Sequence, residues 1–171
     1  MKKLLMVLSV SLVALAALAN PKGYVMVAAH SPGELPSPAY DINGVRFSLL
    51  YGDCQNLNGF DFGFAGRVRE RMNGAQIAIG FSIVDSDFNG FELGCVNYVG
   101  GEFRGLQLGL WNGASSGYGT QLGLVNTADY MAGFQCGLFN WANNLDGVQL
   151  GLSNVVADQA CPWLPFLNIG W

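Results

Sequence analysis

The sequence predicts an all-β protein, a repeat β-solenoid of about eight coils with 14 to 16 residues in each coil. Three observations support this fold class: glycine recurs at a nearly constant interval, apolar and polar residues alternate after each glycine, and the connecting segments keep apolar residues at fixed places. The chain has 171 residues, of which 51% are hydrophobic and 12% charged. This composition excludes a disordered chain and is sufficient for one core.

The first 19 residues are expected to be a secretory signal peptide. Lys2 and Lys3 precede an apolar run, residues 4–18, and small residues stand before the expected cleavage site at Asn20. The run of about 15 residues is shorter than the roughly 20 that a membrane-spanning helix needs. Its removal takes eight basic residues to six against twelve acidic ones, a net charge of about −6. We expect an acidic, exported bacterial protein at the cell surface or in the outer membrane or periplasm.

Residues 44–156 form the predicted repeat domain, in which a glycine recurs from Gly44 to Gly147. A polar residue follows two positions later, a small residue four positions later and, in the last five repeats, an asparagine seven positions later, so that the unit becomes Gly-x-Gln-x-Gly-Leu-x-Asn. Stacked coils bring identical side chains about 4.8 Å apart, so their amides can hydrogen-bond along a ladder. The predicted ladder comprises Gln76, Gln107, Gln121, Gln135, Gln149, Asn97, Asn112, Asn126, Asn140 and Asn154.

Between these polar positions the sequence alternates with apolar residues, as at Leu106, Leu108 and Leu110. Strict alternation predicts a β-strand with one apolar face. Cys95 and Cys136 fall on this face, where we expect them to be small buried core residues. Glycine and asparagine are expected at the corners of the coil, where a positive φ is needed.

The connecting segments favour a solenoid because each keeps apolar residues at two fixed positions, which we call slots. Two such inward-pointing positions indicate that the connection is a second side of each coil. The solvent loops of an up-and-down barrel would have no reason to keep such residues. Nine residues after the repeat glycine stand Val68, Ile83, Val99, Ala114, Ala128, Ala142 and Val156, with Asp53 as the exception. Two residues before the next glycine stand Leu57, Met72, Phe88, Phe103, Met131 and Leu145, with Gly117 as the exception.

The alternative is an eight-stranded antiparallel outer-membrane β-barrel, since the chain has the length of a small barrel and ends in Trp171. Against it, the alternating stretch covers about seven residues, whereas a membrane strand needs about 9 to 11. Cys54 and Cys161 distinguish the two folds. They would be neighbours able to form a disulfide in a barrel, but would lie about 33 Å apart in a solenoid.

The segments on either side of the repeat are expected to cap its open ends. The leader, residues 20–43, contains Pro32, Pro36 and Pro38, and the C-terminal segment, residues 157–171, is rich in proline and tryptophan. Proline and bulky aromatic residues are suited to blocking the edges of a stack of strands.

No catalytic or metal-binding set is recognisable, so the sequence predicts a non-enzymatic protein without a cofactor. His30 is the single histidine and lies outside the repeats, and the four cysteines are isolated. Asp85, Asp87 and Asn89 match the start of a calcium loop, but Val96 stands where a bidentate glutamate is required.

The charge balance limits the partners. A net charge of −4 argues against nucleic acid, because binding to phosphates rests on Lys and Arg. Arg67, Arg69 and Arg71 form the only basic cluster and are expected to be a solvated edge. The expected partner is an unidentified surface ligand or envelope component, and both membrane association and self-association remain open.

The runs GLQLGLWN, TQLGLVN, FQCGLFN and VQLGLSN, with the ending LPFLNIGW, resemble a family of bacterial surface-exposed repeat proteins. The resemblance covers residues 40–171, and it departs from the family pattern where Arg46, Asp61 and Glu92 replace glutamine. It implies an exported, non-enzymatic structural or binding scaffold without an assigned activity, and it carries over no catalytic residue.

Overall fold

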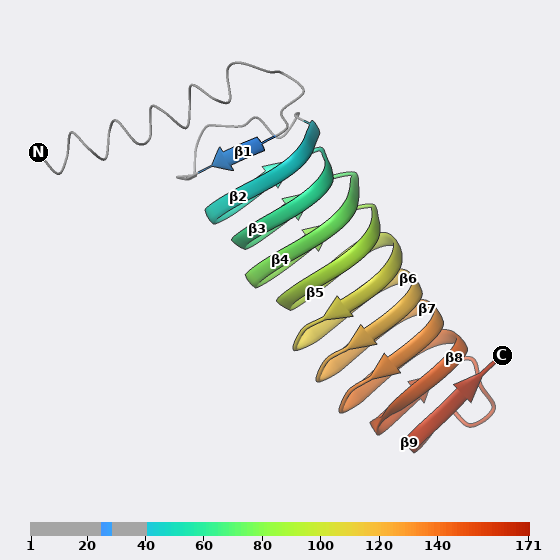
Figure 1. Ribbon diagram of the computed structural model, residues 1–171. Coiled ribbons are helices and arrows are strands. Elements are labelled where there is room, and N and C mark those ends of the chain that lie inside the picture. The colour runs from blue at the N-terminus through green and yellow to red at the C-terminus, as the bar shows by residue number, and fades with distance from the viewer. Residues whose placement is uncertain (1–24, 29–40) are drawn as a thin grey trace, which may run out of the picture.

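The computed structural model describes residues 25–28 and 41–171, and this part of the chain forms an all-β solenoid of about seven turns (Figure 1). Each strand is hydrogen-bonded to the next in chain order. The signal peptide expected at residues 1–19 lies outside the described residues, as does most of the leader. The strands are β1 (Val25–Ala28), β2 (Asp41–Cys54), β3 (Asn56–Val68), β4 (Arg71–Val84), β5 (Asp87–Leu108), β6 (Trp111–Leu122), β7 (Val125–Cys136), β8 (Phe139–Val156) and β9 (Trp163–Gly170).

The coils stack in register, so that each repeat lies on the equivalent residues of the repeat before it. Gly59 pairs with Gly44 and Gln135 pairs with Gln121. The pairs from β1 to β8 are all parallel, and β9 alone runs antiparallel, to β8. Parallel pairing of successive repeats confirms the solenoid and excludes the antiparallel barrel, whose neighbouring strands alternate in direction.

The repeat glycines form the corners of the coils because no other residue fits there. All eight have a φ between 129° and 152°. At Gly90, a Cβ atom would also lie 1.8 Å from the carbonyl oxygen of Gly74 in the coil below. The expectation that asparagine shares this conformation is wrong: among the described non-glycine residues, only Phe166 has a positive φ. The repeat asparagines lie within strands, in ordinary backbone regions, and the chain bends at the Gly-Leu pairs before Asn112, Asn126 and Asn140.

The interior of each coil has an apolar half, built from the two slots of the connecting segments. These side chains form one buried cluster from Ile42 to Ala114 and a second from Ala128 to Val156. The clusters separate near Gly117, where the slot has no side chain and Met131 fills the space. A Cβ atom on Gly117 would lie 2.6 Å from the Met131 sulfur.

The prediction that Ile83 occupies an apolar slot of the interior is wrong. Ile83 is half-buried and points outward, while Val84 is fully buried in the core. The pairing of β3 with β4 shifts register after Gly63, and the pairing of β4 with β5 shifts after Ala78. The shift accommodates the extra residue of this 16-residue repeat, as a β-bulge does, and moves the slot by one position.

In the first coil the core slot is also displaced by one residue, and this displacement explains the exception at Asp53. A register shift lies between Ser48 and Tyr51. As a result Cys54, one residue after Asp53, enters the slot and is fully buried.

The alternating apolar residues point outward, so the prediction that Cys95 and Cys136 are buried core residues is wrong. Cys95 is exposed and Cys136 is partly exposed. The reason is that the intervening positions of the same strands, which carry Gln and Gly, fill the interior instead.

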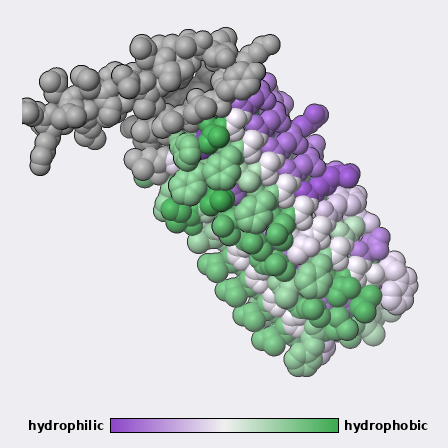
Figure 2. Space-filling model, in the orientation of Figure 1, coloured by the Kyte–Doolittle hydropathy of each residue, from purple (hydrophilic) through white to green (hydrophobic). Residues whose placement is uncertain are grey.

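We call the residues one, three and five positions after each repeat glycine the apolar face. Figure 2 shows apolar residues extending along one side of the solenoid over its whole described length. None of these residues is charged, and Thr120 is the only one with a polar side chain. From the second repeat onward they are Phe60, Phe62, Phe64, Ala75, Ile77, Ile79, Phe91, Leu93, Cys95, Leu106, Leu108, Leu110, Thr120, Leu122, Leu124, Phe134, Cys136, Leu138, Val148, Leu150 and Leu152.

The two ends of the stack are covered differently. At one end β1 pairs in parallel with β2, and at the other β9 turns back and pairs with β8. Cys54 in β2 and Cys161 in the turn before β9 therefore lie at opposite ends of the stack (Figure 1), and all four cysteines are free thiols. Within the described ranges, no helix is long and apolar enough to cross a membrane.

Candidate functional site

The predicted glutamines line the polar half of the interior, and the later ones form a continuous ladder. Gln121 Nε2 donates to Gln107 Oε1 at 2.8 Å, and Gln135 Nε2 donates to Gln121 Oε1 at 2.8 Å. Gln149 continues the series by donating to Gln135 at 2.7 Å. Each amide thus donates toward the preceding coil. Gln121 Nε2 also lies 3.4 Å from the Thr127 carbonyl oxygen, so the ladder joins the two sides of its coil.

The glutamine ladder ends at a buried carboxyl group, Glu92. Gln107 Nε2 donates to Glu92 Oε2 at 2.8 Å, and Ser82 Oγ donates to Glu92 Oε1 at 2.5 Å. Burial raises the pKa of Glu92 to about 7, although these two hydrogen bonds act in the opposite direction. Gln76 lies next to Glu92 in register, and its Oε1 has no hydrogen-bond partner. Gln76 is therefore separated from the other four predicted glutamines.

In the first coils the same row continues as an ion pair. Arg46 Nε and Nη2 donate to the two carboxylate oxygens of Asp61 at 2.7 and 2.6 Å, and Gln76 Nε2 donates to Asp61 Oδ2 at 2.9 Å. Burial acts to lower the pKa of Arg46, but the hydrogen bond and charge of Asp61 outweigh it and raise that pKa. Of the departures from glutamine, Arg46 and Asp61 therefore keep the first coils hydrogen-bonded along this row, whereas Glu92 interrupts it. Opposite charges at equivalent positions of adjacent repeats are the sequence signal for this pair.

The asparagines form a second ladder, in the opposite sense. In the first four asparagines, Nδ2 donates to the Oδ1 of the asparagine in the following coil and also to a backbone carbonyl of that coil, as Asn97 does to Leu108 at 2.8 Å. Asn154, the last of the row, donates to the Gly151 carbonyl at 3.3 Å instead. All five side chains are buried. The successive bonds join Asn97, Asn112, Asn126, Asn140 and Asn154 at 2.7 to 2.8 Å.

The small residues of the repeat make room for this second ladder. A Cβ atom on Gly109 would lie 2.5 Å from the Gly94 carbonyl oxygen and 2.6 Å from Asn97 Nδ2. In the earlier coils, Ser82 and two glycines stand in register with Asn97. Sequence comparison of repeats misses Gly52 and Ser82 because the register shifts displace them by one position, whereas Gly66 stands at the expected seven residues after Gly59.

Each ladder leaves an unpaired oxygen at one end, and the two oxygens lie at opposite ends. Asn97 Oδ1, at the start of the asparagine ladder, has no partner, and neither does Gln149 Oε1 in the last coil. Asn168 of β9 is buried in register with Gln149, and neither of its side-chain polar atoms is hydrogen-bonded. Asn168 is therefore placed at the C-terminal end of the glutamine row.

The arginine cluster forms ion pairs along an exposed edge, as expected for a solvated surface. Figure 2 shows hydrophilic residues gathered over the first coils, away from the apolar side. Two carboxylates of the calcium-like run take part in these pairs. The pairs are Arg67 with Asp85 at 2.7 Å, Arg69 with Asp53 at 2.7 Å, and Arg71 with Asp87 at 4.0 Å.

The remaining reactive groups stand apart from one another. In residues 25–28 and 41–171, no three His, Cys, Asp or Glu side chains are grouped so that they could hold a metal ion. Burial raises the pKa of the Cys54 thiol to about 11, which keeps it protonated and weakly nucleophilic. His30 lies outside the described residues.

The geometry of the ladders holds neighbouring coils in register, since the glutamines from Gln107 onward and the asparagines from Asn97 onward each bond to a counterpart above or below. These amides are neutral and enclosed, whereas most side chains of the apolar face and the paired charges of the arginine cluster are at least partly exposed. No family model, no curated protein and no solved structure matches the chain.

Proposed function

We propose that the protein is a non-enzymatic, exported repeat protein of the bacterial cell envelope that acts as a structural or binding scaffold. The observation that carries this proposal is the mutual hydrogen bonding of the repeat's polar side chains inside the coils. Groups that are satisfied by one another serve to build the stack rather than to meet a ligand. What the protein offers to other molecules is its long, regular surface.

The expected signal peptide and the resemblance of the repeat to surface-exposed proteins support the location. An envelope protein also has to persist outside the cell's chaperone system, and stacked, self-satisfied coils suit that requirement. The proposal therefore assigns the repeat a mechanical role, with the outward faces as its contact surfaces.

The test is export of the full chain expressed in a bacterial host. We expect the exported protein to begin near Asn20 when its N-terminus is sequenced, because cleavage should follow Ala19. Leu12→Arg interrupts the apolar run and should keep the uncleaved chain in the cytoplasm. Retention of residues 1–19 in wild-type protein in the cytoplasm would contradict the proposal.

Surface exposure is measured with a membrane-impermeant maleimide on intact cells. Cys161 is an exposed free thiol near the C-terminus and should be labelled. Cys161→Ser is the matched control that identifies the reacting thiol. Labelling of intact cells places the protein at the cell surface, and labelling only after the outer membrane is permeabilised places it in the periplasm.

A further inference from the structure

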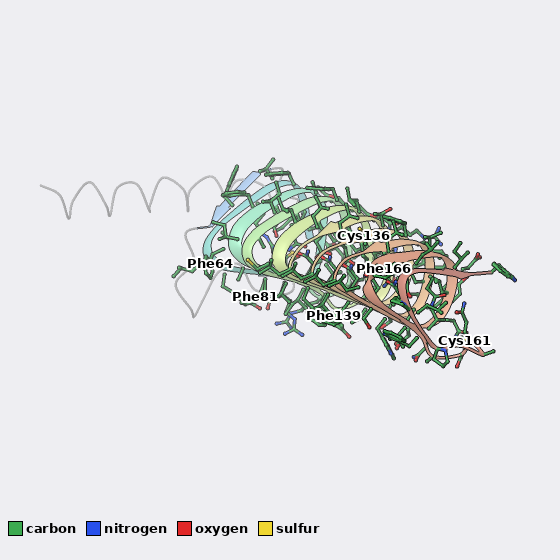
Figure 3. The ribbon with its side chains drawn as sticks, turned by 90° about the horizontal axis from the view of Figure 1, so that it is seen from below. Phe64, Phe81, Cys136, Phe139, Cys161 and Phe166 are labelled. Carbon is green, nitrogen blue, oxygen red and sulfur yellow. The ribbon has the colours of Figure 1, made fainter. Side chains whose placement is uncertain are left out.

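The apolar face runs along the described surface without a contact from another described part of the chain to cover it. Its side chains are substantially exposed: Ile79 is 61%, Leu110 55% and Leu152 58% accessible. Figure 3 places Phe64 of this face along one edge of the solenoid together with Phe81 and Phe139, and all three are exposed. Removal of such side chains from water is favourable, so we expect another molecule to bind over this face.

The size of the face matches that of a protein interface. Eight strands at the usual spacing are about 38 Å high, and five extended residues are about 16 Å wide, which gives about 600 Å² in projection. This equals the upper end of the largest apolar patch on a typical monomer, about 300 to 600 Å². Covering one such face on each of two partners buries about 1,200 Å², the lower limit for specific interfaces.

The chemistry of the face restricts what can cover it. It carries no charge, so a partner that brings charged side chains onto it would bury them unpaired. A lipid surface is usually recruited with Lys and Arg around the inserted apolar residues. Every basic residue in the described parts of the chain is an arginine; Arg46 is buried and the others pair with carboxylates.

We propose that the apolar face packs against the apolar face of a second copy of this chain, forming a face-to-face dimer. Two β-sheet faces pack about 10 Å apart with interdigitating side chains, and the rows of this face repeat at the strand spacing on both partners. A twofold dimer uses the same patch on both partners, so an uncharged face meets an uncharged face. This proposal does not depend on the export or scaffold role, because it concerns the purified protein.

The first experiment measures the mass of the full protein, purified without detergent from whichever cell fraction contains it, by analytical ultracentrifugation. We expect a mass twice that of one chain. Leu93→Glu and Leu122→Glu lie in the middle row of the face and should each halve the mass, since the dimer would bury two opposed carboxylates. Asn144→Glu adds the same charge at an exposed position outside the face and should leave the dimer intact. Circular dichroism confirms that each variant is folded.

A second readout needs no variant, because the face contains its own probe. Cys95 is an exposed thiol on the apolar face, and Cys161 is an exposed thiol outside it. In the dimer, alkylation of Cys95 should be slow compared with that of Cys161, and dilution below the dissociation constant should remove the difference. Burial within one chain would not respond to dilution.

Three outcomes would overturn the proposal. The first is a monomeric wild-type protein at all concentrations tested. The second is a dimer that persists in both Leu93→Glu and Leu122→Glu. The third is a monomer that co-sediments with phosphatidylcholine vesicles and loses this binding in Leu93→Glu, which would assign the face to lipid. None of these outcomes alters the result of the export test.

Discussion

Glu92 is the single carboxyl group in a row that the later repeats fill with glutamine. It accepts hydrogen bonds from Ser82 and Gln107, and its neighbour Gln76 has an unpaired Oε1. In its neutral form Glu92 carries one proton that a carbonyl oxygen could accept. Folding therefore favours the protonated carboxyl group, because the charged form loses its hydration on burial, and this raises the pKa of Glu92.

Glu92→Gln should stabilise the protein above neutral pH. The pKa of Glu92 rises from 4.5 to about 7 on folding, so the folded state binds more protons between these values and stability falls as the pH rises through that window. At pH 8 the variant should be more stable than wild type by up to about 3 kcal/mol, from 1.36 kcal/mol per pKa unit. Glutamine also offers Nε2 to Gln76 Oε1 and would join the two parts of the row.

Urea unfolding of both proteins at pH 5 and pH 8 measures this effect. Glu70→Gln is the control, because Glu70 is exposed and should show little change. An equal stability of wild type and Glu92→Gln at pH 8 would contradict the prediction.

Some residue positions could not be assigned from the sequence. Val84 and Cys54 occupy core slots one residue later than the repeat spacing predicts, because register shifts absorb the additional residues of the early coils. The shift depends on pairing with the neighbouring coil, which spacing within one chain segment does not reveal. The positions of the repeat glycines, by contrast, follow directly from a requirement that only glycine meets.

At the level of single elements, the solenoid contains amide ladders in two environments. The glutamine ladder is buried, whereas Asn43, Asn58, Asn73 and Asn89 form a ladder on the surface at 2.8 to 3.2 Å. Water can replace a lost partner in the surface ladder but not in the buried one. Similar bonds are therefore expected to contribute unequally to stability.

Gln121→Met should destabilise the protein by about 2 to 4 kcal/mol, because it leaves Gln107 Oε1 without its donor and Gln135 Nε2 without its acceptor. Methionine matches glutamine in length, so the volume of the coil changes little. The control, Asn58→Ala, removes a partner from the surface ladder and should cost less than about 1 kcal/mol. Denaturant unfolding compares the two. A similar loss in both variants would show that burial does not determine the contribution of these bonds.

The ladders also explain why the alternation of residues wrongly predicts that the apolar face lies inside the coil. Alternation in a strand identifies two faces, and the usual assumption places the apolar one inside. Here identical amides stack on each other in register, so a polar row is satisfied within the coil and the leucines are left outside. The repeat predicted strands and the residues of both ladders except Gln76, but the direction of each face depends on the closure of the coil.

For the whole molecule, the open edges of the stack are the points of risk. A parallel stack ends in a strand with unpaired backbone groups, which can template pairing with another chain. Here β9 covers the last coil by running antiparallel to β8, a direction that interrupts the repeat. It also places Leu167 and Ile169 beside Leu150 and Val148, at the end of the apolar face.

Removal of residues 157–171 should therefore cause concentration-dependent association beyond a dimer. The exposed edge of β8 would pair with other chains, and light scattering should detect assemblies that grow with time. Cys161→Ser keeps β9 and is the matched control, which should behave as wild type. A truncated chain with the same size distribution as wild type would show that β9 is not needed to protect this edge.

The opposed sense of the two ladders has a consequence for the length of the molecule. Each row of aligned amides adds its dipole along the axis, and a single row would build a larger axial moment with every coil. Because glutamine amides donate toward the preceding coil and asparagine amides toward the following one, the two contributions offset each other. A 14-residue unit could be duplicated or deleted without changing the electrostatic balance of the stack. Electrostatics therefore does not fix the number of coils. Duplication of repeats in the gene could change the length of the solenoid.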